Sequence, residues 1–259
     1  MSFTTHRRSA LVLIALLLAG AATLFGAGSA SAHGSGYTCN GGNINSGWYD
    51  HLVIKGFCTI PDNAYVKVKH DIWVVPGGVL DAVTLATVKV QGDIIVGKGA
   101  VLGLGCTVIG VGCASNSDTE VRGSIIADQP LTMFIDGSKI GGDVISNGGG
   151  PGSKVTEADL AFNFAFKDNK VRGSVVLTGW NGGWMGAIRN WVGGNLYYSW
   201  NRGVDPDSNE IVHNTVGHNL ACFANYPAAQ FGDAVQGQPP SYGPNHVGSH
   251  ALGQCASLV

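Results

Sequence analysis

A seven-residue pattern of apolar and polar positions recurs eight times along the chain. Its first position is Val or Ile, its third is Gly in five copies, its fourth is polar and its fifth is apolar in every copy. The copies begin at Val68, Val90, Val121, Ile140, Val171, Val192, Val216 and Val247, so their spacing varies from one copy to the next. A β-branched residue, a tight bend and a second apolar stretch are typical of a chain that turns a corner between two strands. The pattern therefore predicts a repeated strand–corner–strand unit with loops of variable length.

The repeat indicates a solenoid, because each unit buries its inward side chains only against the units above and below it. Units of this length are too long for a left-handed hexapeptide helix. We expect an all-β, single-domain parallel β-helix, right-handed like most parallel crossovers. Residues 33–259 are assigned to this domain, with an N-terminal cap at 33–60, coils at 61–222, and the last coil and C-terminal cap at 223–259. The 40 glycines argue against long helices, since Gly costs about 1 kcal/mol relative to Ala in a helix.

Two columns of side chains accompany the repeat. Two residues before the first motif position stand Asn169, Asn190, Asn214 and Asn245, with Ser138 in an earlier copy. Stacked Asn side chains hydrogen-bond along a solenoid, so these residues favour a structural ladder over a ligand site. The sixth motif position should point outward where the fifth points inward, which predicts an exposed apolar stripe unless a loop covers it. The stripe consists of Trp73, Ile95, Ile126, Ile145, Val176, Tyr197, Ala221 and Leu252.

The segment 1–32 has the three parts of a secretory signal peptide. Arg7 and Arg8 precede an apolar run from Ala10 to about Leu24, and small residues end the segment at Ala32. A membrane anchor is the alternative, but the run is short for a span of about 20 apolar residues. We therefore expect a secreted, extracellular protein without membrane contact after cleavage.

All six cysteines follow the predicted leader, and an even number in an exported chain favours disulfides over metal binding. Zinc is the competing interpretation, but the chain has no Cys-x-x-Cys pair and disulfide formation would remove the thiolates that zinc needs. Proximity along the chain suggests three pairs: Cys39–Cys58, Cys106–Cys113 and Cys222–Cys255. Such bridges would cross-link the chain near the start, the middle and the end of the solenoid.

Several phrases of the sequence resemble those of known β-solenoid proteins. They are the apolar-x-Gly-[Ser/Asp/Asn]-apolar repeats, the Gly-Trp-Asn-Gly-Gly-Trp stretch at 179–184, and the ending with Asn219-Leu220, Cys222, Pro227-Ala228, Gly232-Asp233 and Gly253-Gln254-Cys255. With these residues the chain resembles a group of exported actinobacterial β-solenoid proteins without an assigned function, over nearly its whole length after position 32. It is more distantly similar to bactofilins, polymer-forming β-helical scaffolds that are cytoplasmic and lack disulfides. The resemblance implies an architecture and no activity.

The charge balance argues against nucleic acid as a partner. Of the 15 Lys and Arg residues, Arg7 and Arg8 lie in the leader, which leaves 13 against 17 Asp and Glu residues. The mature part therefore has no basic excess to neutralise phosphates. Because the chain also lacks a nucleophile elbow, a phosphate loop and a His-Glu-x-x-His motif, we expect no cofactor.

Four charged residues near the predicted corners are candidates for catalysis on a polysaccharide. Asp136, Asp143 and Asp168 would converge, with Arg172 in the motif column that also holds Arg122. Carboxylates with a basic neighbour are the parts of a lyase or a glycoside hydrolase. A structural interpretation is favoured, because short acids commonly accept hydrogen bonds from turn amides.

Two further groups of titratable residues occur late in the chain. The acids are Asp205, Asp207 and Glu210, and the histidines are His213, His218, His246 and His250. The histidines would need to converge to bind a metal, and scattered surface histidines are the simpler interpretation. We therefore predict no metal site.

An aromatic cluster is the strongest candidate for binding. Its members lie close together along the chain and are Trp180, Trp184, Trp191, Tyr197, Tyr198 and Trp200. Exposed Trp and Tyr rings stack on sugar rings and anchor protein contacts. Because Trp side chains are usually largely buried, part of the cluster is expected to pack in the core.

Together these features favour a secreted, non-catalytic β-solenoid with a structural or binding role at the cell envelope. Its expected partners are an extracellular or cell-wall polysaccharide, or a second copy of itself. The alternative is a polysaccharide-active lyase or hydrolase of the pectate-lyase-like β-helix type, acting through Asp136, Asp143, Asp168 and Arg172.

Overall fold

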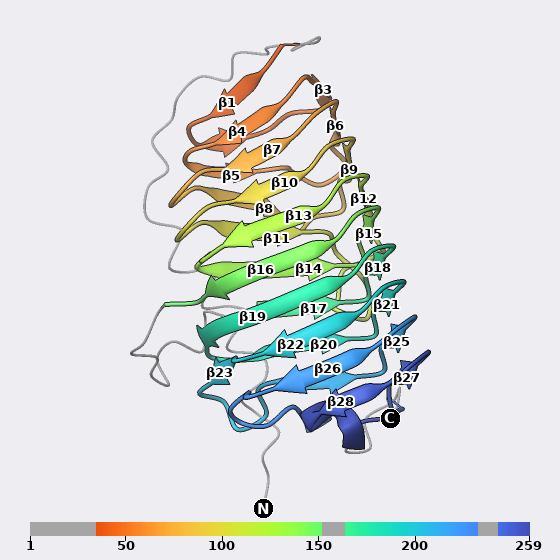
Figure 1. Ribbon diagram of the computed structural model, residues 1–259. Helices are drawn as coiled ribbons and strands as arrows, with labels where there is room; N and C mark the ends of the chain where they lie inside the picture. The colour runs from red at the N-terminus through yellow and green to blue at the C-terminus, as the bar shows by residue number, and fades with distance from the viewer. Residues whose placement is uncertain (1–34, 152–163, 233–242) are drawn as a thin grey trace, which may run out of the picture.

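A computed structural model describes residues 35–151, 164–232 and 243–259, so the predicted signal peptide lies outside the described residues. The described chain winds into a solenoid with three sheets, and every pairing between neighbouring strands is parallel (Figure 1). From β1 to β22 each turn adds one strand to each sheet, so strands three apart in chain order lie side by side in this part of the solenoid. The parallel β-helix predicted from the repeat is confirmed.

Sheet 1 contains β1 (Tyr37–Cys39), β4 (Leu52–Ile54), β7 (Ile72–Val74), β10 (Ile94–Val96), β13 (Ile125–Asp128), β16 (Val144–Gly149), β19 (Val175–Gly182), β22 (Leu196–Ser199), β26 (Leu220–Phe223) and β28 (Ala251–Gly253), with β23 (Arg202–Gly203) paired to β19. Sheet 2 contains β2 (Gly42–Asn43), β5 (Phe57–Thr59), β8 (Val79–Ala82), β11 (Val101–Leu104), β14 (Thr132–Asp136), β17 (Phe164–Lys167), β20 (Met185–Ile188) and β24 (Glu210–Val212). Sheet 3 contains β3 (Gly47–Tyr49), β6 (Tyr65–Val68), β9 (Thr87–Val90), β12 (Asp118–Val121), β15 (Lys139–Ile140), β18 (Lys170–Val171), β21 (Trp191–Val192), β25 (Thr215–Val216) and β27 (His246–Val247). A 3₁₀ helix at Gln254–Ser257 follows β28.

The eight motif copies stack in register, with the first position ending a sheet 3 strand and the fifth beginning a sheet 1 strand. Further strands precede them in the segment 33–60 that was assigned to a cap, where β1, β2 and β3 form a first turn and β4 and β5 begin the next one. There Tyr49 pairs with Val68 and Leu52 pairs with Ile72. The corner between Tyr49 and Leu52 is one residue shorter than the corners of the later copies, so this segment does not match the seven-residue pattern.

The core is a set of stacked inward-facing columns. The first and fifth motif positions are almost completely buried from Val68 and Ile72 to Val216 and Leu220. Full burial of each such side chain stabilises the folded state by about 1.5–3 kcal/mol. Larger buried rings, including Trp180, fill the core in the C-terminal half.

The predicted apolar stripe lies on the outer face of sheet 1. At five of its positions the exposed fraction of the residue is 37–42%, namely at Trp73, Ile95, Ile126, Tyr197 and Leu252. Its other members are half-buried at Ile145 and Val176 and buried at Ala221. All eight lie in one register across sheet 1.

All three predicted disulfides are present: Cys39–Cys58, Cys106–Cys113 and Cys222–Cys255. The first joins β1 to β5 near the N-terminal end of the solenoid, and the third joins β26 to the 3₁₀ helix near its C-terminal end. The second closes the loop after β11. Within the described ranges, no helix is both long enough and apolar enough to cross a membrane.

The predicted asparagine ladder is confirmed at the corner between sheets 2 and 3. The side-chain amides of Asn169, Asn190 and Asn214 each donate to the carbonyl oxygen of the next ladder residue, ending at Asn245, over 3.1, 3.0 and 2.9 Å. The same oxygens accept hydrogen bonds from the backbone amides of the preceding ladder residues, and Ser138 joins through its amide. The ladder thus links five successive turns through buried groups.

A second ladder, which the sequence analysis did not identify, lies at the corner between sheets 1 and 2. The amide of Trp180 donates to Asn201, the amide of Asn201 donates to Asn225, and the side chain of Asn225 donates to Gln254 over 2.8 Å. It spans few turns and ends on a Gln, so its column is too short to stand out in the sequence.

Candidate functional site

The four predicted catalytic residues do not form one site. Asp143 lies at the corner between sheets 3 and 1, where its carboxylate accepts a hydrogen bond of 2.7 Å from the amide of Ser174. Arg172 follows β18 and is exposed. The structure places Asp143 and Arg172 on adjacent turns of this corner, and it brings Asp136, which ends β14, close to Asp168, which follows β17, at another corner. Asp143 is separated from them because its motif position always falls at a different corner.

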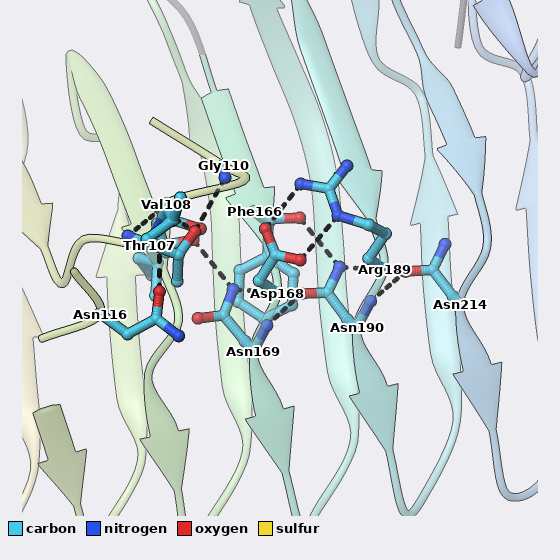
Figure 2. A network of polar contacts seen from close by, with 12 residues as sticks. Thr107, Val108, Gly110, Asn116, Phe166, Asp168, Asn169, Arg189, Asn190 and Asn214 are labelled. Atoms are coloured by element: carbon cyan, nitrogen blue, oxygen red, sulfur yellow. Dashed lines mark hydrogen bonds and ion pairs between the residues drawn. The ribbon is translucent and has the colours of Figure 1, made fainter. Parts of the chain in front are cut away.

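Asp136 is completely buried beneath the loop after β11. Its Oδ2 accepts hydrogen bonds from the amide and the hydroxyl of Thr107 at 2.8 and 2.9 Å, whereas its Oδ1 has no partner among the described residues. A Cβ at Gly110 would overlap the carboxylate, so the loop approaches closely because this residue is glycine. Figure 2 shows the loop residues Thr107, Gly110 and Asn116 beside Asp168. Burial, with a smaller effect from the charge of Asp168, raises the pKa of Asp136 to about 6.

Asp168 forms an ion pair with Arg189, a residue that the sequence analysis did not single out. The guanidinium donates two hydrogen bonds of 2.6 Å to the carboxylate (Figure 2). The two side chains are only 17% and 12% exposed. Both residues have left-handed backbone, with φ of 58° and 57°, and each directly precedes an asparagine of the ladder. The shared corner geometry on neighbouring turns is what makes these two side chains meet.

The charged network continues along the outer face of sheet 2. The Nζ of Lys167 lies 4.5 Å from the ring centroid of Trp184, and the Nε1 of Trp184 donates to the carboxylate of Glu210 over 3.2 Å. Burial lowers the pKa of Lys167 and raises the pKa of Glu210 to about 7. Glu210 is only 4% exposed, although its strand position faces outward. Because the carboxylates of Asp136 and Glu210 are buried, a polymer on the surface does not reach them in this conformation.

The raised pKa values of Asp136 and Glu210 predict a pH-dependent stability. Because the folded-state pKa of each carboxyl is raised, its contribution to stability is fully present below about pH 4, where the carboxyl is protonated. The contribution is lost as the buried carboxyl ionises, up to about pH 6 for Asp136 and about pH 7 for Glu210. For Asp136→Asn we expect a gain in unfolding free energy, relative to the unaltered chain, that grows between about pH 4 and pH 6 and reaches about 3 kcal/mol. Urea unfolding across this pH range measures it, and a pH-independent difference would contradict it.

The predicted aromatic binding cluster is divided among the core and three surfaces. Trp180 and Tyr198 are 1% exposed, and Trp180 donates to the hydroxyl of Ser146 over 3.0 Å. Trp184 is half-buried against Lys167. The exposed rings are Trp191 on sheet 3, Tyr197 on sheet 1 and Trp200 after β22. Their spacing along the chain places them on different sides of each turn, so they form no continuous patch.

The late acids and histidines form no metal site within the described part of the chain. No group of three or more described His, Cys, Asp and Glu residues is arranged to hold a metal ion. Asp205 caps a turn by accepting a hydrogen bond from the amide of Asp207 over 2.9 Å. His213 accepts a hydrogen bond from the amide of Gly243, and the amide of His250 donates to Asn219.

The outer face of sheet 3 carries a row of basic side chains with a tryptophan at each end. In the register of seven successive turns this sheet 3 row consists of Trp48, Lys67, Lys89, Glu120, Lys139, Lys170 and Trp191. The Nζ of Lys67 lies 4.3 Å from the ring centroid of Trp48, and that of Lys170 lies 5.2 Å from that of Trp191. Sheet 3 runs along the right-hand edge of Figure 1. The sequence analysis missed the row, although from Lys67 onward its members directly precede the motif copies.

A hollow of about 520 Å³ adjoins the middle of the sheet 3 row. It is lined by Glu120, Arg122, Lys139, Gly141, Lys170 and Arg172, together with the backbone of the neighbouring positions. Arg122, Gly141 and Arg172 occupy the second motif position on three successive turns, so the glycine leaves a gap between two arginines. A smaller hollow of about 220 Å³ continues past Arg122 toward Tyr65 and Lys67.

No protein-family model, curated protein or solved structure matches this chain.

Proposed function

We propose that the protein is a secreted, non-catalytic β-solenoid that binds a polysaccharide at the cell envelope along the outer face of sheet 3. The observation that carries this proposal is the sheet 3 row, in which four lysines lie in one register between two terminal tryptophans, beside the hollow. Successive strands are about 4.8 Å apart, so a linear polymer lying along the solenoid meets a new side chain at each turn.

The two tryptophans of the row support a carbohydrate ligand. Trp48 is 57% exposed and Trp191 is 42% exposed, and each lies beside a lysine. A tryptophan offers an apolar face for stacking and a polar edge, which suits a sugar ring that has the same two characters. The three disulfides are typical of proteins that fold in an oxidising compartment, which agrees with the proposed export.

The positions of the predicted catalytic residues favour binding over catalysis. Asp136 is buried and Asp143 is engaged by a backbone amide, whereas Arg172 lines the hollow at another corner from Asp136 and Asp168. General acid–base chemistry needs a group within hydrogen-bond reach of the substrate. A lyase or hydrolase remains the alternative and is separated from binding by product analysis.

Replacing Trp191 should weaken polysaccharide binding without unfolding the protein. We expect Trp191→Ala to bind about tenfold more weakly, since loss of one stacked ring in a binding site typically costs about 1–2 kcal/mol. Trp200→Ala is the matched control, because Trp200 is 69% exposed but lies off sheet 3. Affinity electrophoresis of the oxidised protein against a panel of neutral and acidic polysaccharides measures the effect. Equal effects of the two substitutions would contradict the proposed face, and new reducing ends or unsaturated products would show catalysis.

Self-association is a second candidate, and the apolar stripe on sheet 1 supports it. Its exposed members span nearly the whole solenoid, from Trp73 to Leu252. Contiguous exposed apolar surface is typical of protein contact sites. Light scattering of the same samples over a range of concentrations tests this role separately from polysaccharide binding.

A further inference from the structure

Basic side chains outnumber acidic ones around the hollow on the outer face of sheet 3. Its lining holds four basic residues, Arg122, Lys139, Lys170 and Arg172, and one acidic residue, Glu120. Asp143 lies at the same corner as Arg172, but its carboxylate accepts a hydrogen bond from the amide of Ser174. The lining of the hollow therefore attracts anions.

The hollow is the part of this face best suited to receive an acid group. A Cβ at Gly141 would overlap the backbone carbonyl of Arg122, so the turn between the two arginines carries no side chain. Arg122 and Arg172 therefore flank an open floor, with backbones two turns apart, which is roughly 10 Å. A guanidinium presents a planar fork of donors that matches a carboxylate or a sulfate.

The basic groups at the two ends of the hollow differ in how far they are already neutralised. The Nε of Arg122 lies 3.6 Å from the carboxylate of Glu120, and in the adjoining smaller hollow the Nζ of Lys89 lies 2.6 Å from the carboxylate of Asp118. Within the described residues, Arg172 has no ion-pair partner, and Lys170 contacts only the ring of Trp191. Uncompensated positive charge is thus concentrated at Arg172 and Lys170, on the turn directly before Trp191.

We infer that the ligand is a linear acidic polysaccharide, with one acid group held in the hollow beside Arg172 and a sugar ring stacked on Trp191. This inference rests on the proposed function and names the chemistry of its ligand. Nucleic acid is disfavoured, because protein–DNA interfaces are strongly positive, whereas here Glu120 interrupts the basic row and Asp118 pairs with Lys89 beside it.

The test compares acidic polymers with neutral polymers of the same backbone. The probes are polygalacturonate with its carboxyl-reduced form, and dextran sulfate with dextran, which separate a carboxylate from a sulfate as the acid group. We expect at least tenfold tighter binding to an acidic polymer than to its neutral counterpart, because hydrogen bonds to charged groups contribute about 1.5–3 kcal/mol each. This preference should shrink at high salt.

The variant Arg172→Gln should lose about tenfold or more in affinity for the preferred acidic polymer. Lys98→Gln removes an exposed positive charge elsewhere and should change the affinity by less than about twofold. Circular dichroism and melting of both variants confirm that they are folded. Equal binding of acidic and neutral polymers would overturn the acid-group inference and leave polysaccharide binding standing. Binding to none of the four polymers would overturn both, and tighter binding to double-stranded DNA would overturn the choice of ligand.

Discussion

Asn190→Ala is expected to lower the unfolding free energy by about 3–5 kcal/mol. The Oδ1 of Asn190 accepts hydrogen bonds from the amide and the side chain of Asn169, and its Nδ2 donates to the carbonyl of Phe166 over 2.8 Å and to Asn214. Alanine would leave the buried amide of Asn169 and the carbonyl of Phe166 without these partners. Each buried polar group left unsatisfied costs about 1–3 kcal/mol, and the vacated volume adds to the loss.

Urea unfolding followed by circular dichroism measures this effect. Asn40→Ala is the matched control, because Asn40 is exposed, and it should change the unfolding free energy by less than about 0.5 kcal/mol. Asn190→Ser should fall between the two, since Ser138 occupies the same column on an earlier turn. A solenoid is held together by contacts between adjacent turns, so the loss should first appear around β20. A change below about 1 kcal/mol for Asn190→Ala would show that the ladder does not stabilise the stack.

The second large effect is expected for Arg189→Ala, at about 2–4 kcal/mol. The substitution removes both hydrogen bonds to Asp168 and leaves a largely buried carboxylate beside Asp136. Breaking a buried ion pair costs more than breaking an exposed one, because the remaining charge is neither solvated nor paired. The left-handed backbone contributes little to the difference, since Arg and Ala are both unfavourable at a φ of 57°.

A double-mutant cycle tests the cause of this loss. Asp136→Asn should recover part of it, because the neutral amide removes the repulsion between the two carboxylates. Asp136→Asn should therefore stabilise the protein more in the Arg189→Ala background than in the unaltered chain. Arg202→Ala removes an exposed arginine and serves as the control, with an expected change below about 0.5 kcal/mol. Additive effects of the two substitutions would show that the loss of Arg189 does not change the electrostatic environment of Asp136.

The fold could be predicted because its signal repeats. Val68, Ile72 and their equivalents recur on successive turns, and the ladder from Asn169 to Asn245 adds an independent column. The first turn escaped detection because the corner at Tyr49 is one residue short. The pairing of the cysteines also followed from proximity, since the partners lie on the same or adjacent turns.

The site was much less predictable. Asp136, Asp143 and Asp168 look alike in the sequence, but Asp136 lies beneath the loop of Thr107, Asp143 caps a corner amide, and Asp168 pairs with Arg189. The aromatic cluster is dense along the chain and dispersed in space, because consecutive segments of a turn face different directions. The sheet 3 row shows the reverse relation, since its residues are far apart in the sequence and adjacent in space.

The sequence alone determined the inward columns and the asparagine ladder, because burial and stacking demand the same residue type at the same position of successive turns. It also determined the disulfides, whose cysteines are close along the chain. The tertiary structure alone decided which outward side chains meet. Lys139 and Lys170 are separated by a full turn of the solenoid, and only the register of β15 with β18 makes them neighbours. Outward positions are under weaker packing requirements than inward ones, so their identities vary more from turn to turn, and apart from the apolar stripe the sequence analysis did not recognise the surfaces they form.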